Sequence, residues 1–146
     1  MGQITLRCSD INRSLEFYQN IIGMKLLSIQ TVEKYGFTLY FLAFTDEVPP
    51  ESENLHSEQI REWLWQRPYT TLELQHKPGS EIRKMVDEGL GVECIEMKIN
   101  GYETIKHNLS SAGFTVTSSA ALGDTNEKYF QALDPDGAKI TFFSAA

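Results

Sequence analysis

The sequence has few of the features that mark secreted, membrane-bound or disulfide-rich proteins. Its 146 residues include only two cysteines, Cys8 and Cys94, which are too few for a disulfide framework. The first ten residues, MGQITLRCSD, lack the basic and then apolar pattern of a secretion signal. No apolar run approaches the length that spans a membrane. We therefore expect a soluble, cytoplasmic protein.

Positive charge is also scarce. Lysine and arginine total 13 against 20 aspartate and glutamate residues, which gives a net charge of −7. This balance opposes nonspecific binding to nucleic acid and to anionic membranes, so we exclude both as partners. The length fits one ordinary domain that can bury a core without disulfides.

The first half of the chain predicts a strand, a helix and three more strands. Residues 3–8 alternate between polar and apolar side chains, as a half-buried strand does. A helix follows, with Asp10 as its N-cap, Gly23 as its stop and an apolar face at Leu15, Tyr18, Ile21 and Ile22. Three strands are expected over MKLLSIQTV, GFTLYFLAF and TTLELQH, and a short helix, Glu58–Trp65, lies in an acidic insertion before the last of them.

The second half repeats this order, with strands expected at CIEMKI, FTVTSS, KYFQAL and AKITFF and a helix that ends at Gly113. Alignment of the apolar residues places Gln3 over Cys94 and Glu73 over Thr141. We predict an α+β fold of two tandem β-α-β-β-β modules, whose curved mixed sheets form a cleft with these four positions at its floor. The first module is expected over 1–76, the linker over 77–92 and the second module over 93–146.

Glu73 is the most unusual residue of its strand. Leu72 and Leu74 point to one face, while Thr71, Glu73 and Gln75 point to the other. Either this second face is exposed to water, or it lines a polar cavity in which Glu73 is a metal ligand or a base.

Several stretches carry a family resemblance: LRCSDINRSLEFYQNIIGMKLL, TLYFLAF, REWLWQRPYTTLELQHKPGS and LDPDGAKITFF. Together and in this order they resemble the glyoxalase I (lactoylglutathione lyase) family of the vicinal oxygen chelate superfamily. The resemblance implies a homodimer that isomerises the hemithioacetal of methylglyoxal and glutathione to S-lactoylglutathione. It also implies a zinc or nickel ion held by two residues of each module, with a metal-bound glutamate that moves the proton.

Only two of the four metal-ligand positions of the family have a suitable residue in this sequence. Gln3 and Glu73 match two metal ligands, and Glu73 is the candidate catalytic carboxylate. Cys94 stands where the family has histidine, and Thr141 stands where it has the catalytic glutamate. A cysteine thiolate can bind zinc, but a small buried core residue is the favoured interpretation of Cys94. A threonine hydroxyl is a poor metal ligand and no base, so we expect zinc or nickel to bind weakly or not at all.

Arg7 matches an arginine that contacts a glutathione carboxylate in the family, and its guanidinium suits that role. Lys77 replaces an expected asparagine, so a glutathione conjugate is one candidate ligand rather than an assured one. Two functional classes remain open. One is a glyoxalase I-like enzyme in which Cys94, Glu93 or Glu96 replaces the missing donors, and the other is a noncatalytic protein that binds small molecules.

Overall fold

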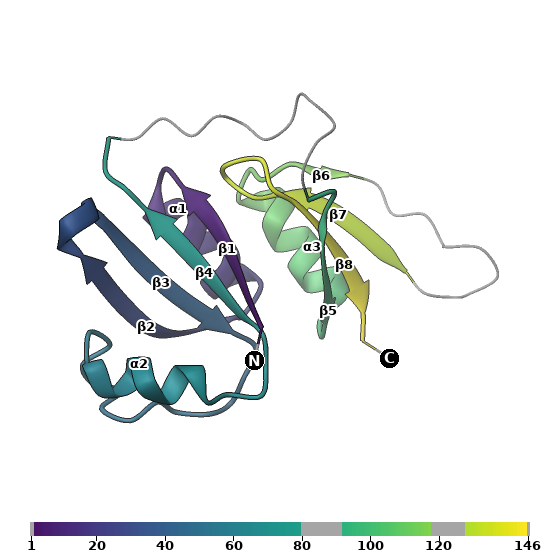
Figure 1. Cartoon of the computed structure of the whole chain (residues 1–146). Helices are drawn as coiled ribbons and strands as arrows, with labels where there is room; N and C mark the ends of the chain where they lie inside the picture. The colour runs from purple at the N-terminus through teal and green to yellow at the C-terminus, as the bar shows by residue number, and fades with distance from the viewer. Residues whose placement is uncertain (1, 80–91, 118–127, 146) are drawn as a thin grey trace. The chain divides into compact units, whose positions relative to one another are not determined.

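A computed structural model describes residues 2–79, 92–117 and 128–145 of the chain (Figure 1). The contacts divide the chain into unit 1, Met1–Ile82, and unit 2, Arg83–Ala146. Each unit contains one four-stranded mixed sheet with helices, as the predicted α+β modules require. Residues 80–91 of the expected linker lie outside the described residues, so the module boundaries stay a prediction.

Unit 1 has the strand order β1-β4-β3-β2, in which β1 is parallel to β4 and the other pairs are antiparallel. The expected strands and the short helix over Glu58–Trp65 are confirmed. The elements are β1 (Gln3–Cys8), α1 (Ile11–Leu15), the π-helical turn η1 (Glu16–Ile21), β2 (Lys25–Val32), the 3-10 turn η2 (Glu33–Tyr35), β3 (Phe37–Ala43), α2 (Glu58–Trp65) and β4 (Thr71–His76).

The first helical segment starts and stops where the sequence predicts, but it buries a different set of side chains. Asp10 caps α1 by accepting a hydrogen bond from the backbone N–H of Arg13, and Gly23 follows the helical segment at φ +89°. Phe17, which the prediction omitted, is fully buried, whereas Leu15 and Ile21 are only half-buried.

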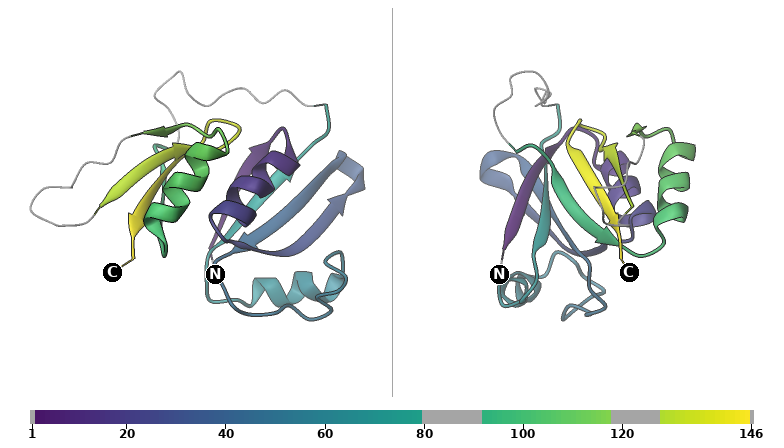
Figure 2. Two further views of the ribbon diagram at one scale, coloured as in Figure 1. Left: turned by 180° about the vertical axis from the view of Figure 1, so that it is seen from behind. Right: turned by 90° about the vertical axis from the view of Figure 1, so that its right-hand side faces the viewer.

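The helical segment α1–η1 covers one side of the sheet of unit 1 (Figure 2). The other side carries a core cluster of Leu27, Phe41, Ala43 and Leu64, the last of these from α2. Phe41 lies directly opposite Glu73 in the β3–β4 register and so shares its face. The idea that the Glu73 face is exposed to water is therefore wrong, because the neighbouring strand and α2 build a core there.

Unit 2 repeats the topology, with strand order β5-β8-β7-β6 and a parallel β5–β8 pair. Aromatic contacts join α3 to the sheet, since the Tyr102 ring packs edge-on against Phe130, which stacks on Phe142. Within FTVTSS the strand covers only Val116–Thr117, and residues 118 and 119 lie outside the described part. The elements are β5 (Ile95–Ile99), α3 (Tyr102–Ser111), β6 (Val116–Thr117), β7 (Tyr129–Leu133) and β8 (Lys139–Ser144).

The predicted alignment of the two halves is confirmed by the strand registers. Ile4 lies opposite Leu72 in unit 1, and the aligned Ile95 lies opposite Ile140 in unit 2. The alternation of the predicted strands and the apolar face of the predicted helix lead us to expect ten apolar side chains to be largely buried, and six of them are: Tyr18, Phe41, Leu72, Ile95, Ile140 and Phe142. Four are half-buried: Leu15, Ile21, Leu39 and Met97. Among the described residues no helix is long and apolar enough to cross a membrane.

Candidate functional site

Gln3 and Glu73, two of the four aligned positions, are in direct contact in unit 1. Gln3 Nε2 donates a hydrogen bond of 2.6 Å to Glu73 Oε2 and a longer one, of 3.5 Å, to Thr5 Oγ1. Thr5 lies directly opposite Glu73 in the parallel β1–β4 register. The strand pairing thus places an amide, a hydroxyl and a carboxylate on one face of the sheet.

The environment of Glu73 favours its neutral form more than water does. Its side chain is only 8% exposed, and this burial raises the pKa of the carboxyl above its ordinary value of 4.5. Hydrogen bonds to Thr5 and Gln3 oppose the shift because they stabilise the carboxylate. Burial outweighs the hydrogen bonds, so Glu73 holds its proton to a higher pH than a surface glutamate does.

Two buried polar atoms beside Glu73 have no hydrogen-bond partner among the described residues. They are Gln3 Oε1 and Thr71 Oγ1, and Gln3 lies directly opposite Thr71 in the strand register. A buried polar atom without a partner costs free energy of about 1–3 kcal/mol. The two atoms are therefore available to a polar ligand atom or a water molecule.

Arg7 extends the same face of β1 towards solvent. It follows Thr5 by two residues along the edge strand and so shares its face, lies opposite Gln75 and is exposed. An exposed guanidinium on an edge strand can meet an anionic group of a ligand.

In unit 2, Thr141 occupies the position equivalent to Glu73. Its side chain is 4% exposed, and Gln131 Nε2 donates a hydrogen bond of 3.0 Å to Thr141 Oγ1. Cys94 precedes β5 and is partly exposed, so the interpretation of Cys94 as a buried core residue is wrong. Positions 94 and 141 lie in unit 2 and positions 3 and 73 in unit 1, and their convergence stays a prediction.

Two glutamates of unit 2 were candidates to replace the missing donors. Glu93 is exposed and forms an ion pair with Lys139, with 3.3 Å between Glu93 Oε1 and Lys139 Nζ. Glu96 lies directly opposite Thr141 in the β5–β8 register and therefore shares its face. Of the two, Glu96 is the carboxylate that lies beside Thr141, where the family has its catalytic glutamate.

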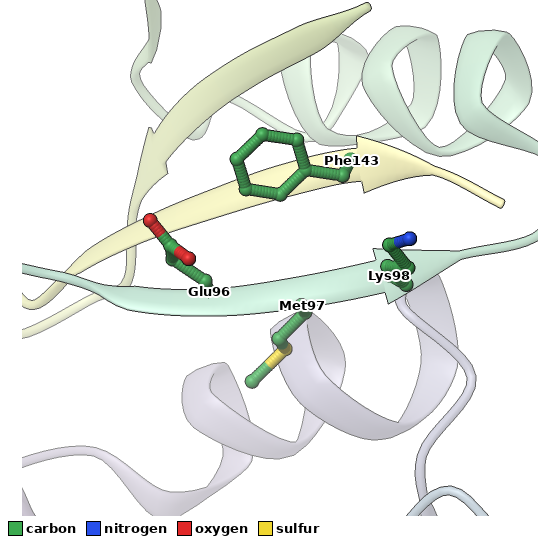
Figure 3. A pocket seen from close by; sticks show the side chains of 4 residues that line it. All are labelled: Glu96, Met97, Lys98 and Phe143. Carbon is green, nitrogen blue, oxygen red and sulfur yellow. The ribbon is translucent and has the colours of Figure 1, made fainter. Parts of the chain in front are cut away.

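A cavity of about 350 Å³ in unit 2 adjoins Glu96. Its lining residues are Glu96, Met97, Lys98 and Phe143. Figure 3 shows Glu96 and Lys98 on β5 and the Phe143 ring on β8, with Met97 directed away from β8. The cavity is therefore lined by two side chains of opposite charge and by two apolar side chains.

The donors present do not fit the catalytic metal site that the family resemblance implies. A catalytic zinc ion takes three protein ligands in most enzymes. Gln3 Oε1 and Glu73 can supply two oxygens, but only one of them is anionic. Across the described ranges no three His, Cys, Asp or Glu residues form a cluster that could hold a metal. Thr141 adds only a neutral hydroxyl, and that hydroxyl already accepts a hydrogen bond from Gln131.

Sequence reasoning missed two polar residues of these faces, Thr5 and Gln131, and the aromatic residue Phe143. The alternation along the first strand that places Gln3 on one face also places Thr5 there, so Thr5 could have been found. Gln131 could not, because its contact with Thr141 depends on the β7–β8 register.

The first 61 residues match the sequence profile of the glyoxalase/bleomycin resistance protein/dioxygenase superfamily. A lactoylglutathione lyase of Neisseria meningitidis is 28% identical over 137 residues, which cover 94% of this chain and 84% of that protein. The match to the superfamily profile covers these 61 residues, and over the longer alignment the chain is a distant homologue of lactoylglutathione lyases.

The proteins to which this chain is similar differ from one another in length and in function. A lactoylglutathione lyase of Oryza sativa is 27% identical over 99% of this chain, but the chain spans only 44% of that protein. Glyoxalase I of Leishmania major has the same fold, with a TM-score of 0.67 at 22% identity over 99% of this chain and 85% of that one. TnmS3, an antibiotic-binding protein from Streptomyces, aligns over 100% of this chain and 95% of its own, with a TM-score of 0.61 at 15% identity.

Proposed function

We propose that this protein is a glyoxalase I-related member of the superfamily that binds a small organic molecule and has little or no isomerase activity. The observation that carries the proposal is the state of position 141. The catalytic glutamate of the family corresponds here to Thr141, which is buried and accepts a hydrogen bond from Gln131. The expected metal site is thereby degenerate.

The chemistry of the isomerase reaction explains why this position decides the function. Moving a proton between the two carbons of a hemithioacetal requires a base and an electrophile that stabilises the enediolate. A threonine hydroxyl does not ionise near neutral pH and carries no proton between carbons. Glu73 is one candidate carboxylate, but without a second anionic donor the metal that would act as electrophile binds weakly.

Ligand binding is supported by features that need no metal. Gln3 Oε1 and Thr71 Oγ1 lack partners among the described residues, and Arg7 presents an exposed guanidinium on the same face of β1. These groups suit a polar, anionic ligand such as a glutathione conjugate. TnmS3, the antibiotic-binding protein, is an example of a binding function on this fold.

A second candidate is an isomerase with a rewired site. The position of Glu96, directly opposite Thr141, favours it because a carboxylate is present one strand away from the family position. In this version Glu96, with Cys94, would supply the donors that Thr141 cannot.

Metal analysis together with a turnover assay separates the two candidates. The purified protein is titrated with zinc and with nickel, and formation of S-lactoylglutathione from methylglyoxal and glutathione is followed by its thioester absorbance. We expect substoichiometric metal and little turnover, while S-lactoylglutathione still binds in calorimetry. A stoichiometric metal with turnover that Glu96→Gln abolishes would instead establish the rewired isomerase.

The family resemblance also leads us to propose a homodimer in which the first module of one chain faces the second module of its partner. Sedimentation velocity at micromolar concentration tests this assembly. A single monomeric boundary across that range would exclude it.

A further inference from the structure

The two units carry the same pair of side chains in opposite arrangement. In unit 1, Thr5 on β1 lies directly opposite Glu73 on β4. In unit 2, Glu96 on β5 lies directly opposite Thr141 on β8. Because β5 corresponds to β1 and β8 to β4 in the shared topology, the carboxylate and the hydroxyl have exchanged strands.

The exchange moves the carboxylate from an enclosed position to an open one. Glu73 lies on an inner strand and is buried, whereas Glu96 lies on the edge strand β5 and is exposed. Unit 2 therefore presents an exposed carboxylate at a place where unit 1 presents a hydroxyl.

This carboxylate belongs to a compact four-residue arrangement at the cavity of unit 2. Glu96 and Lys98 share one face of β5, and Thr141 and Phe143 lie directly opposite them on β8. Both charges lie along the edge strand, and the hydroxyl and the aromatic ring lie along the inner strand. Three of the four line the cavity of about 350 Å³, together with Met97. Figure 3 shows these lining side chains.

We propose that this cavity binds a small zwitterion with an apolar side chain, of the α-amino acid class. The ligand ammonium pairs with the Glu96 carboxylate, the ligand carboxylate pairs with the Lys98 ammonium, and the apolar side chain packs on Phe143. The inference rests on the proposed small-molecule function and deepens it by naming a ligand class for unit 2.

The spacing of the two charges favours this class. Side chains two residues apart on one strand face are about 7 Å apart at their Cα atoms. A group whose ammonium and carboxylate share one carbon can bridge them, with one charge-assisted hydrogen bond of about 2.8 Å at each end. A divalent cation is disfavoured, because calcium takes at least six oxygen ligands and this cavity offers one carboxylate.

The same zwitterionic group occurs in free amino acids and at the γ-glutamyl end of glutathione. A free apolar amino acid fits better, because its side chain packs on Phe143. The experiment therefore includes both sources, with L-phenylalanine as the first probe and S-lactoylglutathione as the second.

The test is an NMR titration of the full chain with L-phenylalanine and two matched analogues. Phenethylamine lacks the carboxylate, and 3-phenylpropionate lacks the ammonium. We expect L-phenylalanine to shift the amide resonances of Glu96, Lys98 and Phe143. Glu96→Gln and Lys98→Met should each weaken it by roughly tenfold or more, the effect of one charge-assisted hydrogen bond.

The analogues make the assignment specific. Binding of phenethylamine should depend on Glu96 and not on Lys98, and binding of 3-phenylpropionate should show the reverse dependence. Glu103→Gln is the matched control, because Glu103 is an exposed carboxylate on α3 that pairs with Lys128. Equal affinities in the two site variants and the control would overturn the proposal.

The remaining outcomes separate this inference from the proposed function. If S-lactoylglutathione binds with a dependence on Glu96 and L-phenylalanine does not bind, the zwitterion site stands and its source is the γ-glutamyl group. If S-lactoylglutathione binds independently of Glu96 and L-phenylalanine shifts nothing, the inference is overturned and the proposed function stands. Failure of every probe would overturn both.

Discussion

Gln131 donates a hydrogen bond of 3.0 Å from its Nε2 atom to Thr141 Oγ1. The two residues face each other across the antiparallel β7–β8 pair. An amide N–H donor suits a carboxylate oxygen as well as a hydroxyl. The surroundings of position 141 thus retain a partner for the glutamate that lactoylglutathione lyases are expected to carry there.

The first prediction concerns restoration of the metal site. The double variant Cys94→His/Thr141→Glu supplies an imidazole and an anionic oxygen, and Gln131 is in place to orient the new carboxylate. We expect zinc affinity to rise by roughly tenfold or more, since even outer-shell partners change metal affinity by that factor. Competition with a chelator measures the affinity, and the two single variants are the controls. An unchanged zinc affinity would mean that the four aligned positions do not form one site.

The second prediction concerns the buried carboxyl of Glu73. Its pKa in the folded protein is raised by burial, so the unfolded chain loses this proton first as the pH increases. The free energy of unfolding should therefore fall as the pH rises from the ordinary value of 4.5 through the raised value. Glu73→Gln removes this ionisation and keeps an acceptor for Gln3, so it should be more stable than the parent at neutral pH.

Thermal melts of both proteins from acid to neutral pH check this. The advantage of Glu73→Gln should shrink below the ordinary glutamate pKa, where both states of the parent are protonated. Glu103→Gln, at an exposed position, should show no such pH-dependent gain. A gain that persists unchanged in acid would show that ionisation of Glu73 is not its cause.

The third prediction concerns Arg7. If an anionic ligand binds over the Gln3–Glu73 face, Arg7→Ala should weaken S-lactoylglutathione binding by roughly 1.5 to 3 kcal/mol, the scale of a hydrogen bond to a charged group. Calorimetric titration measures the difference. Arg61→Ala on α2 removes an equally exposed guanidinium and serves as the control. Equal affinities for the two variants would place Arg7 outside the binding site.

The fourth prediction concerns the buried face of the first helical segment. Phe17 is fully buried, and Ile21 is half-buried. Phe17→Ala should lower the free energy of unfolding by roughly 3–5 kcal/mol, the range for a buried aromatic residue. Ile21→Ala should cost clearly less. Urea denaturation of both variants tests this, and a larger effect at Ile21 would contradict the buried face that the structure shows.

The order of the strands and helices could be predicted from this sequence because local patterns determine it. Residues 3–8 and 94–99 alternate clearly, and the Glu58–Trp65 helix has Ser57 as its N-cap. The alignment of the two halves was also within reach, because the apolar residues recur in the same order. Both predictions depend on the order of polar and apolar residues along the chain, and this order can be taken directly from the sequence.

The side-chain environments could not be predicted in the same way. The face of Glu73 reads as polar in the sequence, yet it is buried because Phe41 lies opposite and Leu64 of α2 packs on the same cluster. The burial of Phe17 was missed because the apolar residues of this segment are compatible with more than one buried face, and packing against the sheet decides between them. Compared with unit 1, unit 2 has its carboxylate, Glu96, and its hydroxyl, Thr141, on exchanged strands, and this can be recognised only from the pairing of β5 with β8.

The parallel pairing of β1 with β4 has a consequence for how unit 1 folds. The two strands lie at opposite ends of the unit in sequence, so their pairing requires closure of nearly the whole segment. The β2–β3 hairpin is local and can form early. During synthesis on the ribosome, the Gln3–Glu73 contact must wait until the last strand of the unit has emerged, and the first strand remains an unpaired edge until then.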